Sequence, residues 1–132
     1  MRSLDEILDL LRTLGFPVFD TEATGADLTK PYLIVSGAFG NRATETNMCG
    51  LDELDDLRVR HVAPSAGVVR QMTKRTRNLL DKRRLHTETQ VVDLVRDNTL
   101  VMNFDPDVPV PGMKNQHVKQ LIDEYAAYRQ TL

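Results

Sequence analysis

The most constraining feature of the chain, within residues 56–84, is a short alternating segment that leads directly into an amphipathic, strongly basic helix. In the alternating segment, Leu57, Val59 and His61 fall on one side of a strand, and the residues between them fall on the other. Ser65 suits the N-cap of the following helix. The apolar stripe of that helix comprises Val69, Met72, Thr76, Leu79 and Leu80. Its polar face comprises Arg70, Lys74, Arg75, Arg77, Lys82, Arg83 and Arg84. The pattern predicts a strand-to-helix unit that buries one helix face and exposes a cationic one.

The formal net charge of −2 hides a strong asymmetry along the 132 residues. Residues 1–57 carry eleven acidic and four basic side chains, whereas residues 58–84 carry nine basic side chains and a single acid, Asp81. A chain of this length is one domain with a single modest core. An acidic part and a basic part therefore share one small protein.

Three interpretations of the basic helix face are open at this point. Complementary surfaces on one protein favour head-to-tail self-association, in which different patches of two copies meet. Clustered Lys and Arg also suit nucleic-acid phosphates, although a sequence pI of about 5.9 and few aromatic residues argue against this. The third interpretation is a solvated helix face without a partner.

The N-terminal half contains patterns for a helix, two strands and two loops. The stripe of the first helix comprises Leu4, Ile7, Leu8, Leu11 and Leu14. Gly15 suits a left-handed cap after it, and residues 16–19 suit a short edge strand that tolerates a proline. Residues 20–30 should form a polar loop, and residues 32–35 a strand buried on both faces. Residues 41–55 should form a long exposed loop that is suited to partner contact.

The C-terminal part is less regular. Residues 89–95 and 99–104 flank a possible turn at 96–98, which predicts an antiparallel hairpin. The proline-rich residues 105–112 should not form regular structure. In the last segment, Val118, Leu121, Ile122, Tyr125 and Tyr128 recur at helical spacing, so periodicity alone favours a helix there.

The residues that could perform chemistry form no recognisable site. The three histidines are far apart in sequence, and none lies at the spacing of a zinc site. The only cysteine, Cys49, has no neighbouring base and predicts an inert thiol in a reducing compartment. The acids Asp52, Glu53, Asp55 and Asp56 lack the spacing of a calcium loop. We therefore expect no catalytic residue, no metal and no cofactor, and a protein that is not an enzyme.

Two further patterns bear on where the protein is found. No apolar run reaches the length of a membrane span, and the acidic N-terminal residues do not suit a signal peptide. We therefore expect a soluble protein, without membrane contact, that is made and used in a cytoplasm.

The order of these elements resembles that of the tail terminator proteins of long-tailed (siphovirus-type) bacteriophages, especially those of phages that infect actinobacteria. The resemblance covers nearly the whole chain. It rests on the leucine-rich first helix, a short strand ending near Phe19-Asp20, Pro31-Tyr32-Leu33-Ile34-Val35, the strand 57–62 with Ser65 and the basic helix, the turn Val110-Pro111-Gly112, and Asp123-Glu124-Tyr125 with Tyr128-Arg129. The chain departs from the family in its polar stretch 114–120 and in a less strand-like end.

The resemblance implies a fold. It implies a single α+β domain over residues 1–132, with a mixed, mostly antiparallel β-sheet and two α-helices packed on one face. It also implies that residues 120–129 pair as a strand beside the sheet, against their helical periodicity, and we adopt the strand.

The resemblance also implies a function. Tail terminators form hexameric rings that cap the tail tube, end its polymerisation and join the tail to the head connector. The chain would then be a structural virion protein of the tail or neck, assembled in the host cytoplasm. Its partners would be further copies of itself, the major tail tube protein and the head-tail connector or head-closure protein, with DNA passing through the ring without specific binding.

Other functions remain as alternatives. A head-closure or adaptor protein of the same virion neck would share the small size and the lack of catalysis. A DNA-binding regulator would use the basic helix on phosphates, with steeply salt-dependent binding. A small hydrolase is the weakest alternative, because the residues supply no set of nucleophile, base and orienting group.

Two sets of residues carry these expectations. The predicted single core beneath the sheet comprises Leu8, Leu11, Ile34, Val59, Val69, Met72, Leu79 and Val101. The predicted interface residues are Arg70, Lys74 and Arg77 on the helix and Asn41, Thr44, Asp52 and Glu53 in the loop. Reversing the three helix charges to Glu should weaken assembly and preserve the fold, because exposed charges contribute little to monomer stability.

Overall fold

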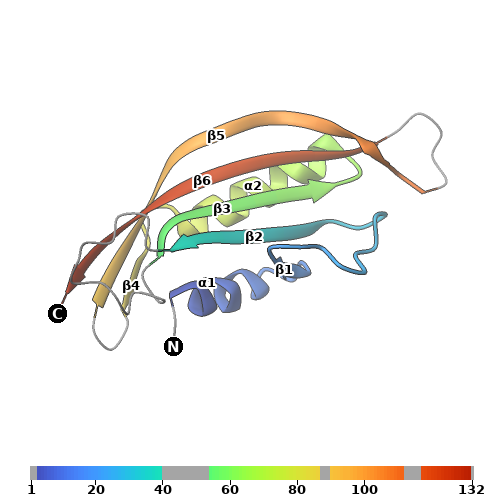
Figure 1. The fold of residues 1–132 in the computed structure, drawn as a ribbon. Helices are drawn as coiled ribbons and strands as arrows, with labels where there is room; N and C mark the ends of the chain where they lie inside the picture. The colour runs from blue at the N-terminus through green and yellow to red at the C-terminus, as the bar shows by residue number, and fades with distance from the viewer. Residues whose placement is uncertain (1–2, 40–53, 87–89, 112–116, 132) are drawn as a thin grey trace.

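The protein folds into one curled β-sheet with two helices (Figure 1), as the computed structural model of residues 3–39, 54–86, 90–111 and 117–131 describes it. The helices are α1 (Ser3–Arg12) and α2 (Ala66–Leu80), and the strands are β1 (Val18–Asp20), β2 (Tyr32–Phe39), β3 (Leu54–Ala63), β4 (Arg84–His86), β5 (Gln90–Pro109) and β6 (His117–Thr131). The strand order is β1-β2-β3-β6-β5-β4. The pair β1 and β2 is parallel, and the other neighbouring pairs are antiparallel. The predicted α+β fold is confirmed.

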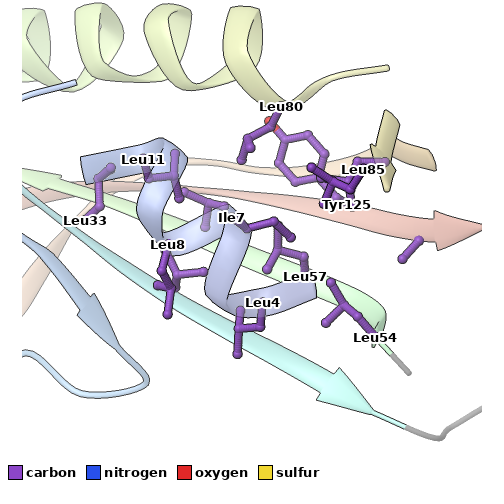
Figure 2. Close-up of a cluster of buried hydrophobic side chains, with 14 of the residues drawn as sticks. Leu4, Ile7, Leu8, Leu11, Leu33, Leu54, Leu57, Leu80, Leu85 and Tyr125 are labelled. Atoms are coloured by element: carbon purple, nitrogen blue, oxygen red, sulfur yellow. The ribbon is translucent and has the colours of Figure 1, made fainter. Parts of the chain in front are cut away.

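The main hydrophobic core lies between the two helices and one face of the sheet. Ile7 and Leu11 of α1 and Met72 of α2 are fully buried in it. The sheet contributes alternate residues of β2, β3, β5 and β6, namely Leu33, Val35, Leu57, Val59, Val92, Leu94, Tyr125 and Ala127. Figure 2 shows this cluster where α1 lies over the sheet. Because α1 and α2 share one core, they pack on the same face, as predicted.

A second, smaller cluster lies on the opposite face of the sheet. It comprises the buried Tyr32, Val62, Val110 and Val118, with the partly buried Phe19, Ala23, Ala26, Leu28 and Ile34 packed against them. The prediction of one core was therefore wrong for Ile34, because strand alternation places it on the face opposite Leu33 and Val35. The predicted burial of β2 on both faces is confirmed, and part of the 20–30 loop covers the second face.

The unit formed by β3 and α2 follows its sequence pattern closely. Leu57, Val59 and His61 are buried on the helix side of β3, as predicted. Ser65 caps α2, and its hydroxyl oxygen accepts a hydrogen bond from the backbone N–H of Val68 at 3.3 Å. The helix ends at Leu80, so the last three basic residues of the segment, 82–84, lie beyond it.

The structure of β5 differs most from the prediction. The proposed hairpin is wrong, because residues 90–109 form one strand that pairs with β6. The suspected turn is a bulge between Arg96 and Asn98, where one extra residue is absorbed without reversing the chain. A second irregularity separates Leu100 from Asn103, and Val101 within it is 84% exposed, so its assignment to the core was wrong. The strand also continues to Pro109 through residues that were expected to be irregular.

The final strand and the two loop boundaries complete the comparison. The predicted strand at 120–129 is confirmed as part of β6, which pairs with β3 and β5 on its two sides. The strand β3 begins at Leu54, so Leu54 and Asp55, which were expected in the exposed loop, are buried strand residues. The rest of that loop, residues 41–53, lies outside the described residues. Neither described helix has the length and apolar composition needed to cross a membrane.

Candidate functional site

The basic residues of α2 divide between two sides of the helix. On the side of α1, the guanidinium group of Arg75 donates a hydrogen bond to the carbonyl oxygen of Leu14 at 3.0 Å and lies 5.1 Å from the ring centre of Phe16. Arg75 therefore joins α2 to the end of α1. Its charge contributes to packing within the chain, and the cationic surface lies on the other side of the helix.

Arg70, Lys74 and Arg77 share that other side, because residues at i, i+4 and i+7 form one stripe along an α-helix. With Thr73, Asn78 and Leu121 of β6, they line a groove of about 300 Å³, which we call the basic groove. Arg70 and Lys74 are exposed, and neither makes an ion pair within the described parts of the chain. Two cations at this groove are therefore available to an anionic partner.

Arg77, in contrast, is bound within the fold. Its Nε and one terminal nitrogen donate to the two carboxylate oxygens of Asp123 on β6, both at 2.8 Å. The Asp123 side chain is fully buried and also accepts a hydrogen bond from the Thr99 hydroxyl at 2.7 Å. This two-point geometry, with the contact to Thr99, ties α2 to β5 and β6 beside the basic groove.

The electrostatics of this pair follow from its geometry. Burial raises the pKa of Asp123, but the hydrogen bonds from Arg77 and Thr99 outweigh burial and leave the pKa below its usual value. The hydrogen bond to Asp123 raises the pKa of Arg77. Both groups are therefore charged at neutral pH. An anionic partner at the groove would meet the free charges of Arg70 and Lys74 more than that of Arg77.

His61 lies beneath the same part of α2 and is fully buried. Its Nδ1 is 2.9 Å from the carbonyl oxygen of Leu121, and its Nε2 is 2.6 Å from the Thr76 hydroxyl oxygen. Burial lowers the pKa of His61, which favours the neutral ring. The neutral ring that satisfies both contacts donates from Nδ1 to Leu121 and accepts from the Thr76 hydroxyl at Nε2.

The contact between Thr76 and His61 has the geometry of a hydroxyl nucleophile and its base, but it is enclosed. Both side chains have 0% exposure, so no substrate reaches either atom in this structure. The His61 ring is oriented by a backbone carbonyl and holds Thr76 of α2 against β6. We therefore assign the pair to packing between α2 and the sheet.

Asp81, the single acid of the basic segment, has a local role at the end of α2. It is the C-cap residue, and its carboxylate accepts a hydrogen bond from the backbone N–H of Arg96 at 3.0 Å. Arg96 adjoins the bulge in β5, and its N–H lies on the outer edge of the strand beyond the end of the β4 pairing, where a side chain can bind it. Asp81 thus fixes the bulge to the helix end.

The structure places the predicted interface residues unequally. Arg70 and Lys74 lie together at the basic groove, whereas the charge of Arg77 is engaged by Asp123. The premise that all three charges are exposed and free was therefore wrong for Arg77, and we now expect its reversal to destabilise the fold. The remaining predicted residues, Asn41, Thr44, Asp52 and Glu53, lie outside the described residues. Among the described residues, no cluster of three or more His, Cys, Asp or Glu side chains could hold a metal ion.

Sequence reasoning missed Asp123, which binds the guanidinium group of Arg77 at the basic groove. Alternation along β6 would have been the signal, because Leu121 and Tyr125 flank Asp123 on the helix side of the strand. A carboxylate on a buried sheet face requires a charged or hydrogen-bonding partner. Its partner, Arg77, lies 46 residues away, and no local pattern connects the two.

A second groove shows that acidic and basic groups also meet within the chain. It has a volume of about 400 Å³ and is lined by Glu6, Asp9, Leu10, Thr13, Arg83, Arg84, Leu85 and His86. Asp9 pairs with Arg12 at 3.1 Å, and Arg84 pairs with Asp93 at 2.8 Å. Part of the charge asymmetry of the sequence is thus balanced locally.

Comparison with known proteins adds no identification. No protein-family model matches the chain, and no curated protein sequence matches it significantly.

Proposed function

We propose that this protein is a structural subunit of a virion neck, which assembles as a ring on the end of a phage tail tube, ends its polymerisation and joins the tail to the head connector. In such a ring, the basic groove receives acidic side chains of an adjacent subunit or neck protein. The ring would be a hexamer, as in the tail terminators that the sequence resembles. The protein would perform no catalysis and would reside in the virion.

The fold supports this proposal in two respects. The α+β architecture is the one that the resemblance implies, with both helices on one sheet face. The terminal strand β6, where the resemblance and the helical periodicity disagreed, is a central strand of the sheet. These features agree with the family's architecture, and other functions are found on α+β folds as well.

The single observation that carries the proposed contact is the pair of exposed cations at the basic groove. Arg70 and Lys74 lie one helical turn apart at a groove that Arg77 also lines, and the charge of Arg77 is paired with Asp123. Surface charges of this kind contribute little to stability, and they do determine partner choice and the rate of association. A carboxylate-bearing surface is complementary to this groove in charge.

The experiment is a double charge reversal that spares the buried ion pair. Arg70→Glu with Lys74→Glu should leave the melting temperature within a few degrees of wild type, because both side chains are exposed. Complementation of a phage that lacks the protein should then yield unjoined tails or tails of irregular length, visible by negative-stain electron microscopy. The matched control is Lys30→Glu with Lys82→Glu, which changes the net charge equally at exposed positions outside the groove.

Three results would contradict the proposal. Normal tails and normal infectivity from a well-expressed groove variant would exclude the groove as a required joint. Tails of normal length that fail only to attach heads would favour a head-closure or adaptor protein. Steeply salt-dependent DNA binding by the wild type, lost in the groove variant, would favour the DNA-binding regulator.

A further inference from the structure

Among the residues that the structure describes, no strand pairs with the outer edge of β5 over much of its length. On that edge, β4 pairs only with residues 91–93 of β5, and the backbone N–H groups of Leu94 and Arg96 are bound by Arg83 and Asp81. From residue 97 to 104, no described strand lies beside this edge. In Figure 1, β5 arches along the rim of the molecule with β6 on one side only. Because two bulges shorten it, this segment lies beside six residues of β6, from Lys119 to Glu124, which span about 20 Å, enough for an additional strand of ordinary length.

The side chains along this edge protect it little, because Asp97 is the single charged residue among residues 97–104, although the two bulges of β5 interrupt the ladder there. Residues 97–104 contain no proline, lysine or arginine, which are the residues that commonly discourage pairing at an edge. Leu100, Val101 and Phe104 are 41%, 84% and 55% exposed. They are three of the five large apolar side chains that are exposed in the described chain. An open ladder edge and exposed apolar side chains therefore coincide on one segment.

The strand at the opposite edge of the sheet, β1, lies at the same position along the strand direction as this segment of β5. Phe19 of β1 pairs with Ile34, Ile34 with Arg60, Arg60 with Ile122, and Ile122 with Leu100. Phe19 and Leu100 are thus the first and last residues of one row of cross-strand partners that runs across the sheet. Both side chains also belong to the face opposite the helices, because cross-strand partners share a face.

The strand directions match as well. β1 is parallel to β2, and three antiparallel steps lead from β2 through β3 and β6 to β5. β1 and β5 therefore run in opposite directions. If a second copy is placed beside the first with its sheet continuing in the same sense, its β1 meets the open edge of β5 antiparallel, with little shift along the strands.

We propose that the open edge of β5 pairs with β1 of a second copy of this chain, so that the sheets of adjacent copies become continuous head to tail. The pairing rests on the proposed function in that a repeated head-to-tail contact produces a closed ring or an open filament. The three residues of β1 determine the register, and Val101 and Phe104 supply apolar contact area.

A disulfide between copies tests the register. In a Cys49→Ser background, Phe19→Cys and Leu100→Cys are combined, and the purified full chain is oxidised alone and with tail tubes. These positions lie at opposite edges of one sheet and cannot join within a chain. In the proposed contact they are cross-strand partners on the same face, within the range that a disulfide spans. A ladder of multimers on a non-reducing gel, abolished by reductant, is expected.

The controls separate this contact from chance collision. In the control pair, Phe19→Cys with Val95→Cys, the second cysteine is also on β5 and on the same sheet face as Leu100, but it is not opposite Phe19 in the proposed register. This pair should give at most about a tenth of the cross-linked product. Each single variant should give no ladder. Melting curves for all variants show whether the loss of the Phe19 ring, which packs on Tyr32, has unfolded the protein. In that case Asp20→Cys with Thr99→Cys, which end the adjacent row on the other face of the sheet, serves as the replacement pair.

Three outcomes would overturn the inference, and a fourth would support it and remove only the proposed function. A quantitative dimer from Leu100→Cys alone would indicate symmetric pairing of two β5 edges, and an equal ladder from the Val95 control would indicate non-specific contact. No ladder from folded double variants would exclude the pairing, even if the wild type still caps tails and the proposed function stands. A ladder from a protein that never caps tails would keep the pairing and remove the proposed function.

Discussion

The part of the sheet beneath α2 and the outer edge of β5 are neighbours in the fold, and they differ in how their groups are satisfied. Beneath α2, the fully buried Asp123 and His61 have partners from the chain itself. Along residues 97–104 of β5, one edge is unpaired in the described structure and Val101 is 84% exposed. Buried polar groups need hydrogen-bond partners within the monomer. The backbone groups of an exposed strand edge can instead hydrogen-bond to water and remain free to pair with another strand. The comparison separates residues that hold the fold from residues available for assembly.

The largest expected difference is between two arginines of α2. Arg77→Met should lower the free energy of unfolding by about 3–5 kcal/mol, because it leaves the buried carboxylate of Asp123 without its cation. The matched change Arg70→Met, at the same groove but exposed, should change it by no more than about 0.5 kcal/mol. Urea unfolding of both variants measures the contrast. Equal losses of stability would show that Arg70 also stabilises the fold and is not a free charge available to a partner.

The main core should show the next largest effect. Leu11→Ala removes a fully buried side chain and should cost about 2–5 kcal/mol, through lost burial and a residual cavity. Leu100→Ala removes the same atoms from a side chain that is 41% exposed on β5, and should cost less than about 1 kcal/mol. Thermal unfolding with matched buffers compares the two. A larger loss of stability for Leu100→Ala would show that side chains at the edge of β5 contribute to the stability of the monomer.

The unit of β3 and α2 was predictable because its signals are local. Alternation, an N-cap and a helical stripe all fall within residues 57–80 and agree with one another. The β5 segment was not predictable in the same way, because a residue that bulges inside a strand resembles a turn in sequence. Pairing with the long strand β6 determines that the segment is a bulge and not a turn, and β6 lies more than twenty residues later in the chain.

Two residues of β6 explain why its periodicity misled. Ile122 packs on one face of the sheet and Tyr125 on the other, and both are buried. When both faces of a central strand are covered, the period of two disappears and a helical spacing can arise by chance. The candidate site was predictable only in part for a similar reason. Arg70 and Arg77 look alike in sequence, and only the distant Asp123 distinguishes them.

His61 makes the region beneath α2 sensitive to pH. Its pKa is lowered by burial, so the unfolded chain binds a proton more readily than the folded one. The stability that depends on a neutral ring is complete above the unfolded pKa of about 6.5 and is lost as the pH falls toward the folded pKa. The slope below pH 6.5 should be at most about 1.4 kcal/mol per pH unit, the value for one proton. His61→Gln should be less stable but should lack this slope in urea titrations below pH 6.5. A slope that persists in His61→Gln would assign the titration to other groups.

The smallest expected effect on stability is at Val101. Val101→Lys should change the free energy of unfolding by no more than about 0.5 kcal/mol, because the side chain is 84% exposed and has little packing to lose. A lysine on an open strand edge does, however, discourage pairing with another strand. The substitution should therefore leave the melting temperature of the dilute protein unchanged and reduce the yield of cross-linked multimers between copies. Val95→Lys, on the same strand but outside the open edge, is the control. A loss of melting temperature as large as that of Leu11→Ala would contradict this prediction. It would show that the Val101 side chain stabilises the monomer, and that the outer edge of β5 does not differ from the region beneath α2 in the way proposed.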